Sequence, residues 1–451
     1  MKLNSLELKN FRCFESINID FDEQLTVLVA ENGAGKTTIL DGIAVALGVF
    51  VGSFDTGVNK GFKSQDALLS KIEADDNRGL TNMEAQYPIV MTAQGIIQDK
   101  PETWRRKLTG AKSKTTVAEA SSLRSYGKHL QEQVRTPNTK VDLPIVAYYG
   151  TGRLWRQIQA RESFSKESLS RLFAYHDALE PASSYKEFEK WFRDTARAEY
   201  DAIVAKVQSH QTINPSDLLP KEANTLKSVR EAVNICLKIT GWNGLQYDAK
   251  SKELVIKDAA NRFFAVNQLS DGVKNMLAMT ADIAYRCAKL NPHLTNAHQE
   301  TEGVVLIDEI DMHLHPKWQQ TVLQDLQKSF PKIQFIVTTH SPQVLTTVKA
   351  EHIRILSNDN QSVTIPSINT YGEESKVTLE DVLHVSSRPV CSDGKSQRLK
   401  EYLQRINQGD IDSSDIIMLR KQLESDFGES YSKLKLADMV INKWQAKRSM
   451  S

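Results

Sequence analysis

The stretch LTVLVAENGAGKTTIL, residues 25–40, constrains the fold more than any other part of the sequence. An apolar run is followed by a short loop with two glycines and then by a segment with helical periodicity, which predicts strand, loop and helix in that order. The loop matches the phosphate-binding pattern G-x-x-x-x-G-K-[ST], except that Ala30 replaces the first glycine. A loop that keeps φ negative at this position accepts alanine. The sequence therefore favours a phosphate-binding loop over an ordinary glycine-rich turn.

The residues of this loop suit a nucleotide. Gly33 and Gly35 leave the backbone bare, so that successive N–H groups can form an anion nest in front of the positive end of the following helix. Lys36 is expected to contact the β- and γ-phosphates, and Thr37 to ligate Mg²⁺.

A second half of the site is predicted from GVVLIDE, residues 303–309. This apolar strand would deliver Asp308 to its C-terminal tip, where the carboxylate would hold Mg²⁺ through water. Glu309 would polarise the attacking water as a general base. Two solvated acids at a strand end are the alternative, but the loop at 30–37 makes a joint site the better interpretation.

Two further motifs have weaker signals of their own. LSDG, residues 269–272, precedes an apolar helix from Asp271 to Leu290, so Ser270 is expected to be its N-cap and could meet a γ-phosphate. TTHSP follows a strand, and His340 at its tip could contact the γ-phosphate and the water. A plain helix cap and a structural histidine are the alternatives.

The histidines of DMHLHP, His313 and His315, lie close in sequence to Asp308 and Asp311 and so raise the question of a transition-metal site. Two histidines without a further Cys or His cluster do not complete a ligand set. A structural or interface loop is the preferred interpretation.

Alternating strands and helices predict an α/β fold with a mixed, largely parallel sheet and flanking helices. The N-terminal 25 residues suggest an antiparallel pair of strands, residues 51–140 contain weakly periodic, loop-like stretches, and residues 155–240 are mostly helical.

Lys plus Arg number 57 against 56 acidic residues, so the net charge gives no argument for nucleic-acid binding. The cysteines are scattered, and Cys236 and Cys287 are expected to be buried, which favours a reducing cytoplasm. The sequence has no apolar run of 18 residues, and its N-terminus resembles a strand and not a signal peptide. We therefore expect a cytoplasmic protein without membrane spans.

In this order, NFRCF, AENGAGKTT, LSDG, VLIDEIDMHLHP and TTHSP resemble the ABC-type ATPase heads of SMC, RecF and related proteins. The resemblance implies ATP and Mg²⁺ as cofactors, Glu309 and His340 as catalytic residues, and Asp311 in a loop that crosses a dimer interface. The implied nucleotide-binding residues are Arg12, Asn32, Gly33, Ala34, Gly35, Lys36, Thr37, Thr38, Ser270, Gly272 and Asp308, with Thr37 and Asp308 at the metal. Two molecules would sandwich two ATPs, with the Ser270–Gly272 segment reaching the ATP of the second subunit, and a higher oligomer could follow.

The glutamine that such heads place near the metal is open among Gln94, Gln98 and Gln157. AYYGTGRLW, residues 147–155, follows a predicted strand where that loop is expected, so Tyr149 and Arg153 are expected to act near the site.

AYYGTGRLW, DEIDMHLHPKWQ and the helical tail are also similar to the PtuA family, the ATPase subunits of Septu-type anti-phage systems and their retron-associated relatives. That resemblance implies a separate HNH nuclease subunit and DNA contacted by the complex. The chain itself is expected to carry no nuclease site.

The expected organisation has four parts: an N-terminal lobe of the ATPase head at 1–150, a mainly helical insertion at 151–243, a C-terminal lobe with the signature, Asp308 strand and switch histidine at 244–371, and a helical partner or oligomer region at 372–451. In the last part, Tyr402, Leu403, Met439 and Trp444 are candidates for a docking surface, with plain internal packing as the alternative.

Two other functions stay open. A RecF-like repair ATPase would bind DNA directly, through the basic, Trp-containing stretches RLWRQIQAR (153–161) and WRRKL (104–108). A nucleotide-gated scaffold would bind ATP and dimerise with negligible hydrolysis.

Overall fold

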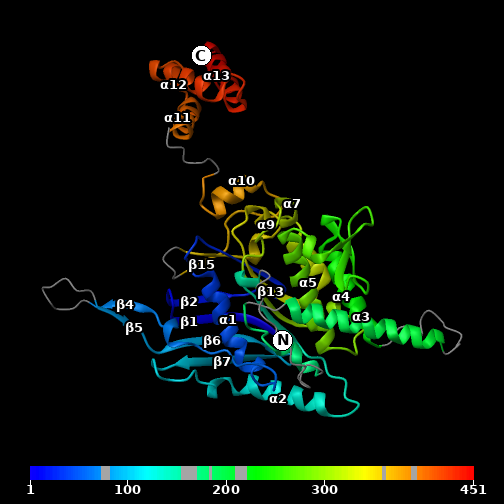
Figure 1. The fold of residues 1–451 in the computed structure, drawn as a ribbon. Helices are drawn as coiled ribbons and strands as arrows, with labels where there is room; N and C mark the ends of the chain where they lie inside the picture. The colour runs from blue at the N-terminus through cyan, green and yellow to red at the C-terminus, as the bar shows by residue number, and fades with distance from the viewer. Residues whose placement is uncertain are drawn as a thin grey trace. The chain divides into compact units, whose positions relative to one another are not determined.

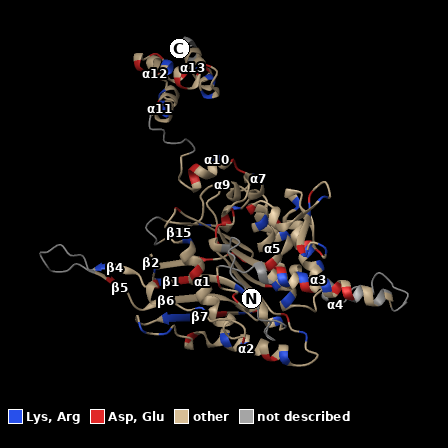
Figure 2. Cartoon of the chain, viewed as in Figure 1, with Lys and Arg blue, Asp and Glu red and all other residues tan. Residues whose placement is uncertain are grey.

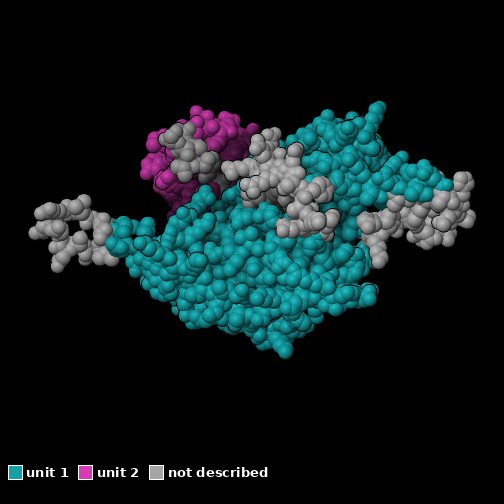
Figure 3. Space-filling model, turned by 60° about the horizontal axis from the view of Figure 1, so that its bottom comes forward, with its two compact units in different colours: residues 1–383 teal, residues 384–451 magenta. Residues whose placement is uncertain are grey.

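The structure, a computed structural model, describes residues 1–72, 82–153, 170–181, 185–208, 221–357, 362–386 and 394–450. It divides into two compact units, Met1–Leu383 and His384–Ser451, which are coloured separately in Figure 3. Residues 372–383, expected to begin the helical C-terminal region, thus belong to the first unit.

The central sheet of the first unit has six strands in the order β15-β14-β3-β13-β12-β8. Two of them, β13 and β15, are labelled in Figure 1. The strands of this sheet are β3 (Leu25–Val29), β8 (Ile145–Tyr149), β12 (Gly303–Ile307), β13 (Ile333–Thr338), β14 (Ile353–Leu356) and β15 (Val363–Thr364). Five run parallel and β15 runs antiparallel to β14. Every residue of β3, β8, β12 and β13 is buried, as expected of a parallel sheet covered on both faces. The prediction of a mixed, largely parallel sheet is confirmed.

A second sheet is antiparallel, in the order β2-β1-β6-β7. Its strands are β1 (Lys2–Phe11), β2 (Phe14–Asp20), β6 (Ile89–Ile97) and β7 (Lys100–Leu108). The predicted N-terminal strand pair is confirmed, whereas β6 and β7 were not predicted from the sequence. In β6 alternate residues are buried, so threonine and glutamine interrupt the apolar run that a fully buried strand would show.

Smaller strands complete this unit. The hairpin β4 (Leu69–Ile72) and β5 (Asn82–Ala85) leaves the antiparallel sheet, and β9 (Asn243–Asp248), β10 (Glu253–Lys257) and β11 (Phe263–Ala265) form a three-stranded sheet just before the LSDG motif.

Helix α1 (Lys36–Val51) lies between the two large sheets, and fourteen of its sixteen residues are buried. A helix buried on all sides needs apolar residues all around, which the sequence ILDGIAVALGVFV supplies. Gly42 lets α1 approach β1 closely, since a Cβ there would lie 3.0 Å from a methyl group of Leu8. The helix that follows the phosphate-binding loop is therefore held rigidly from both sides.

Strand β7 contradicts the proposal that WRRKL binds nucleic acid. Trp104 and Arg106 are each 1% exposed, and their side chains donate to the α1 carbonyls of Ala46 (3.1 Å) and Val45 (2.7 Å). Burial lowers the pKa of Arg106 to about 10. The other face of the strand carries Arg105 and Lys107, which pair with Glu119. Figure 2 shows this basic strand, but its alternation splits the motif between core and surface. The stretch RLWRQIQAR lies outside the described residues from 154 onward.

The other helices of this unit are α2 (Ser121–Arg135), α3 (Tyr185–Gln208), α4 (Lys221–Cys236), α5 (Asp271–Leu290), α6 (Ala297–Glu300), α7 (Pro316–Gln319), α8 (Val322–Ser329), α9 (Pro342–Leu345) and α10 (Ser375–Val377). The described part of 155–240 is largely helical, as predicted, and Cys236 and Cys287 are buried. Helices α7 and α8 are separated only by Gln320 and Thr321. In the part of the chain that the structure describes, no helix has the length and apolar character needed to cross a bilayer.

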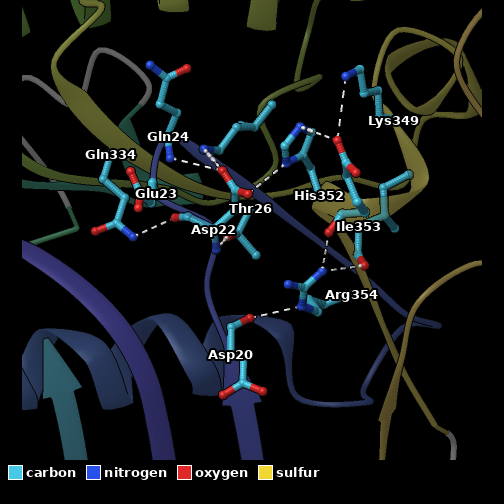
Figure 4. A network of polar contacts seen from close by, with 12 residues as sticks. Asp20, Asp22, Glu23, Gln24, Thr26, Gln334, Lys349, His352, Ile353 and Arg354 are labelled. Carbon is cyan, nitrogen blue, oxygen red and sulfur yellow. Dashed lines mark hydrogen bonds and ion pairs between the residues drawn. The ribbon is translucent and has the colours of Figure 1, made fainter.

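A polar network fixes the edge at which β3, β13 and β14 begin (Figure 4). Asp22 accepts the backbone N–H of Gln24 (3.0 Å) and contacts Nδ1 of His352 at 3.1 Å. Burial opposes ionisation of Asp22, but these partners outweigh it and lower its pKa. Gln334 Nε2 donates to the Asp22 carbonyl (2.7 Å) and Arg354 Nε to the Asp20 carbonyl (2.9 Å). The network sets the register of the strand that leads into the phosphate-binding loop.

The second unit consists of α11 (Lys395–Asn407), α12 (Ser414–Phe427) and α13 (Ser432–Met450) around a core of its own. The prediction of a helical C-terminal region is confirmed over these residues. Tyr402 is 1% exposed and belongs to this core, so its assignment to a docking surface is wrong, and Trp444 packs against Gly409. Met439 is exposed, as are Ile417, Met418 and Leu436.

The buried His298 predicts a pH dependence of stability. Its Nδ1 lies 2.8 Å from Ser228 Oγ, and burial lowers its pKa from 6.5 to about 4. The unfolded chain therefore binds a proton first, so stability is retained above pH 6.5 and decreases by about 3 kcal/mol as the pH falls towards 4. His298→Asn should flatten this part of the curve of unfolding free energy against pH, whereas the exposed His129→Gln should not; equal slopes in all three proteins would contradict the prediction.

Candidate functional site

The phosphate-binding loop has the backbone geometry that the sequence predicts. Gly33 and Gly35 take left-handed φ values of 84° and 94°, while Ala30 stays outside the left-handed region. A Cβ on Gly35 would lie 2.4 Å from Phe14 Cζ and 2.8 Å from Cys13 Sγ, whereas a Cβ on Gly33 would meet nothing within 4 Å. Gly35 is thus needed for both backbone conformation and space, and alanine at position 30 is tolerated because φ is ordinary there.

Lys36, the first residue of α1, closes the loop on itself. Its Nζ donates to the carbonyls of Ala30 (3.0 Å) and Glu31 (3.1 Å). Burial lowers the pKa of Lys36, and the carboxylates of Asp308, Glu309 and Asp311 oppose this shift. The ammonium is therefore held over the loop and faces the acids that follow β12.

The two halves of the site meet at Thr37 and Asp308. The Oγ1 of Thr37 lies 2.8 Å from Oδ2 of Asp308, although 271 positions separate them in the chain. The sheet order places β3 and β12 on either side of β13, so their C-terminal ends adjoin. A hydroxyl and a carboxylate fit Mg²⁺, which takes few protein oxygens and completes its shell with water and phosphates. The described residues contain no cluster of three or more His, Cys, Asp or Glu that could hold another metal.

Thr338, the last residue of β13, orders both acids of this site. Its Oγ1 donates to Oδ1 of Asp308 (2.6 Å) and accepts the backbone N–H of Glu309 (2.8 Å). The backbone of Glu309 is left-handed, with φ 48°, a conformation that a non-glycine residue rarely adopts and that is common at functional sites.

His340 lies two residues beyond β13. Burial lowers its pKa and the nearby Lys36 adds to this, while Asp311, Glu309 and Asp308 oppose the shift. The lowered pKa favours the neutral imidazole, which can donate one hydrogen bond and accept one. Ser341 caps α9, with its Oγ accepting the N–H groups of Gln343 and Val344.

Arg12 is bound to carboxylates in this structure. Its Nη1 donates to Asp41 (2.6 Å) on α1 and its Nε to Asp66 (2.9 Å), and these contacts raise its pKa against the effect of burial. A phosphate contact of Arg12, as implied by resemblance, stays a prediction that would require these pairs to rearrange.

The LSDG segment lies at the start of α5. Ser270 occupies the N-cap position, but its exposed hydroxyl makes no capping hydrogen bond. A Cβ on Gly272 would lie 2.4 Å from the carbonyl oxygen of His313. The glycine thus allows α5 to approach the 311–315 loop within one chain, a reason for glycine that does not depend on a nucleotide. His313 and His315 themselves belong to this loop, where Nδ1 of His315 accepts the N–H of Lys317.

Neither Gln94 nor Gln98 lies where the glutamine loop is expected. Gln94 lies on β6 and Gln98 in the turn after it, so neither follows a strand of the parallel sheet. Gln157 and the side chain of Arg153 lie outside what the structure describes. Tyr149 ends β8; its carbonyl accepts the N–H of Asp308 (2.8 Å), and its buried hydroxyl donates to Asp282 of α5 (2.7 Å).

The structure therefore brings together Lys36, Thr37, Asp308, Glu309 and His340. Ser270 and Gly272 lie beside the 311–315 loop instead, and Asn32 is exposed at the loop while Ala34 and Thr38 are buried. Sequence reasoning missed Thr338 and Thr339, although both are in the quoted TTHSP motif. The available signal was two hydroxyl residues at the end of an otherwise apolar strand.

Comparisons with known proteins identify the family of the chain. Residues 5–237 match the family described as AAA domain, and residues 153–345 match the family described as AAA ATPase domain. "Septu protein PtuA" of Bacillus thuringiensis is 39% identical over 80% of this chain and 77% of that protein. "Retron Ec83 probable ATPase" of Escherichia coli is 29% identical over 97% of this chain and 86% of that protein. A solved SMC head bound to the C-winged helix domain of ScpA covers 81% of this chain at 17% identity, with a TM-score of 0.47.

The two loop glycines provide a matched pair of variants. Gly33→Ala should cost about 1–2 kcal/mol, the strain of a left-handed alanine in open space. Gly35→Ala should cost more, because the same strain is joined by a clash with Phe14 in the core. Urea unfolding of both variants measures the difference, and equal losses would show that the close approach of Gly35 to Phe14 has no energetic weight.

Proposed function

Because the chain belongs to the PtuA family of AAA-domain ATPases, we propose that it binds Mg²⁺·ATP between the phosphate-binding loop and Asp308, hydrolyses it, and acts in anti-phage defence. The observation that carries the ATP site is the 2.8 Å contact between Thr37 Oγ1 and Asp308 Oδ2. These oxygens come from the two elements that hold the metal in phosphate-loop ATPases. Lys36 lies next to them, where it can exchange its carbonyl partners for phosphate oxygens.

Glu309 is the proposed general base. It directly follows the metal carboxylate, and its N–H is tied to Thr338, so the start of the side chain has a fixed direction. A carboxylate in this position can take the proton of a water aligned with the γ-phosphate. His340, in its neutral form, would hold the γ-phosphate or that water by a hydrogen bond.

Two copies are proposed to close around two ATPs. The exposed Ser270 hydroxyl lies at the N-terminus of α5, a helix of 20 residues, where hydroxyl and backbone N–H groups favour an anion. Asp311 lies on the adjoining 311–315 loop. A second copy would bring its γ-phosphate to this surface, so ATP binding would close the dimer and hydrolysis would open it.

A separate HNH nuclease is the proposed partner, with DNA contacted by the assembled complex and no nuclease site in this chain. The exposed Ile417, Met418, Leu436 and Met439 of α12 and α13 are candidate contacts for that partner or for a higher oligomer. Co-purification with an HNH protein encoded beside this chain would support the assignment, and its absence from the purified complex would contradict it. The alternative of a RecF-like DNA-binding protein loses the support of residues 104–108, whose Trp104 and Arg106 are in the core.

Glu309→Gln tests hydrolysis and closure together. Without the base, ATP should stay intact, and light scattering should show a dimer that persists in ATP and returns to the monomer after ATP is removed. Lys36→Ala is the matched control, since it should bind ATP at least about tenfold more weakly and stay monomeric. A Glu309→Gln protein whose mass does not change with ATP would contradict the ATP-sandwich proposal, and wild-type turnover equal to that of Glu309→Gln would favour a nucleotide-gated scaffold.

A further inference from the structure

The segment that carries His340 also holds the acids that follow β12. Thr338 and Thr339 are both fully buried, and each uses its hydroxyl twice. Buried hydroxyls that both donate and accept fix the groups around them, because a lost partner leaves an unsatisfied polar group in the core.

Thr338 acts on the metal carboxylate. Its hydroxyl proton goes to Oδ1 of Asp308 at 2.6 Å, which leaves Oδ2 facing Thr37 at 2.8 Å. The same oxygen accepts the N–H of Glu309 at 2.8 Å. One hydroxyl thus sets which carboxylate oxygen points to the metal site and anchors the backbone of the proposed base.

Thr339 acts on a different loop. Its Oγ1 donates to Oδ1 of Asp311 at 2.5 Å and accepts the N–H of Ser341 at 3.0 Å. Ser341 Oγ donates to Gln319 Oε1 at 2.7 Å, and Gln319 Nε2 donates to the Leu314 carbonyl at 2.9 Å. The 311–315 loop is therefore held at both of its ends by residues 339–341.

This loop is also the one on which α5 packs, through the close approach of Gly272 to the His313 carbonyl. A movement of residues 339–341 would therefore reach both the loop and the first turn of α5. The hydroxyl of Thr338 contacts Asp308 and Glu309 directly, and it is joined to the loop only through the backbone, where the Glu309 carbonyl accepts the N–H of Met312 at 3.0 Å.

We infer that Thr338 and Thr339 are positioning residues with separate tasks: Thr338 orients Asp308 for Mg²⁺ in its own site, and Thr339 orients the 311–315 loop for the second copy. The inference rests on the proposed ATPase function. The two hydroxyls should therefore affect different measurements: Thr338 the Mg²⁺ requirement, and Thr339 the affinity of the dimer.

The test compares Thr338→Val and Thr339→Val, which keep the branched shape and remove the hydroxyl, with Thr338→Ser and Thr339→Ser, which keep the hydroxyl. Thr338→Val should raise the Mg²⁺ concentration for half-maximal ATP binding about tenfold or more, the effect of losing a hydrogen bond to a charged group. Thr339→Val should leave that concentration within about twofold of wild type and weaken ATP-dependent dimerisation, measured with Glu309→Gln as background, about tenfold. Each serine variant should restore the wild-type value.

Several outcomes would overturn the inference: an unchanged Mg²⁺ requirement in Thr338→Val, an unchanged dimer affinity in Thr339→Val, or serine variants as impaired as the valine variants. If a valine variant does not fold, as judged by thermal unfolding, alanine at the same position takes its place with the same expectations. Failure of the wild-type protein to bind Mg²⁺·ATP would instead refute the proposed function, so the two failures are distinguishable.

Discussion

The contact between Thr37 and Asp308 depends on the order of strands in the central sheet. Each residue is supplied by a strand or helix start whose position is fixed by its neighbours, and β13 lies between the two. Because parallel strands end at the same edge, residues from positions 37, 308 and 338 meet there. The site is therefore a property of the whole sheet, and an error in the register of any of these strands would separate the oxygens of Thr37 and Asp308.

The rigidity of α1 has the same origin. Its burial between a parallel and an antiparallel sheet leaves the loop before it as the place where a ligand can be accommodated. The side chains of Trp104 and Arg106 hold the second half of the helix, and the Figure 4 network holds the start of β3 at the opposite edge. Nucleotide binding would then move Lys36 and the loop, while the frame around them keeps its place.

The sequence predicted those elements that are marked by a pattern among neighbouring residues. The phosphate-binding loop, the Asp308 strand and the helical C-terminal region were predicted because glycine spacing, apolar runs and helical periodicity are features of neighbouring residues. Strands β6 and β7 were missed, and WRRKL was misjudged, because only pairing with β1 and packing on α1 decide which of their residues face inward. The hydrogen bonds of Thr338 and Thr339 and the close approach of Gly272 to His313 join segments that are far apart in the sequence. Patterns among neighbouring residues do not predict such contacts. The ordinary φ of Ala30 shows why the loop accepts alanine where the motif has glycine.

The central claim is that Thr37 and Asp308 jointly bind the metal of an Mg²⁺·ATP complex. Isothermal titration of the full chain with ATP, in Mg²⁺ and in EDTA, tests it most directly, with Asp308→Asn as the comparison. The account predicts one ATP per chain, binding that is at least about tenfold tighter in Mg²⁺ than in EDTA, and loss of most of this difference in Asp308→Asn. Binding of equal strength in Mg²⁺ and EDTA, or an Asp308→Asn protein with the full Mg²⁺ effect, would contradict it.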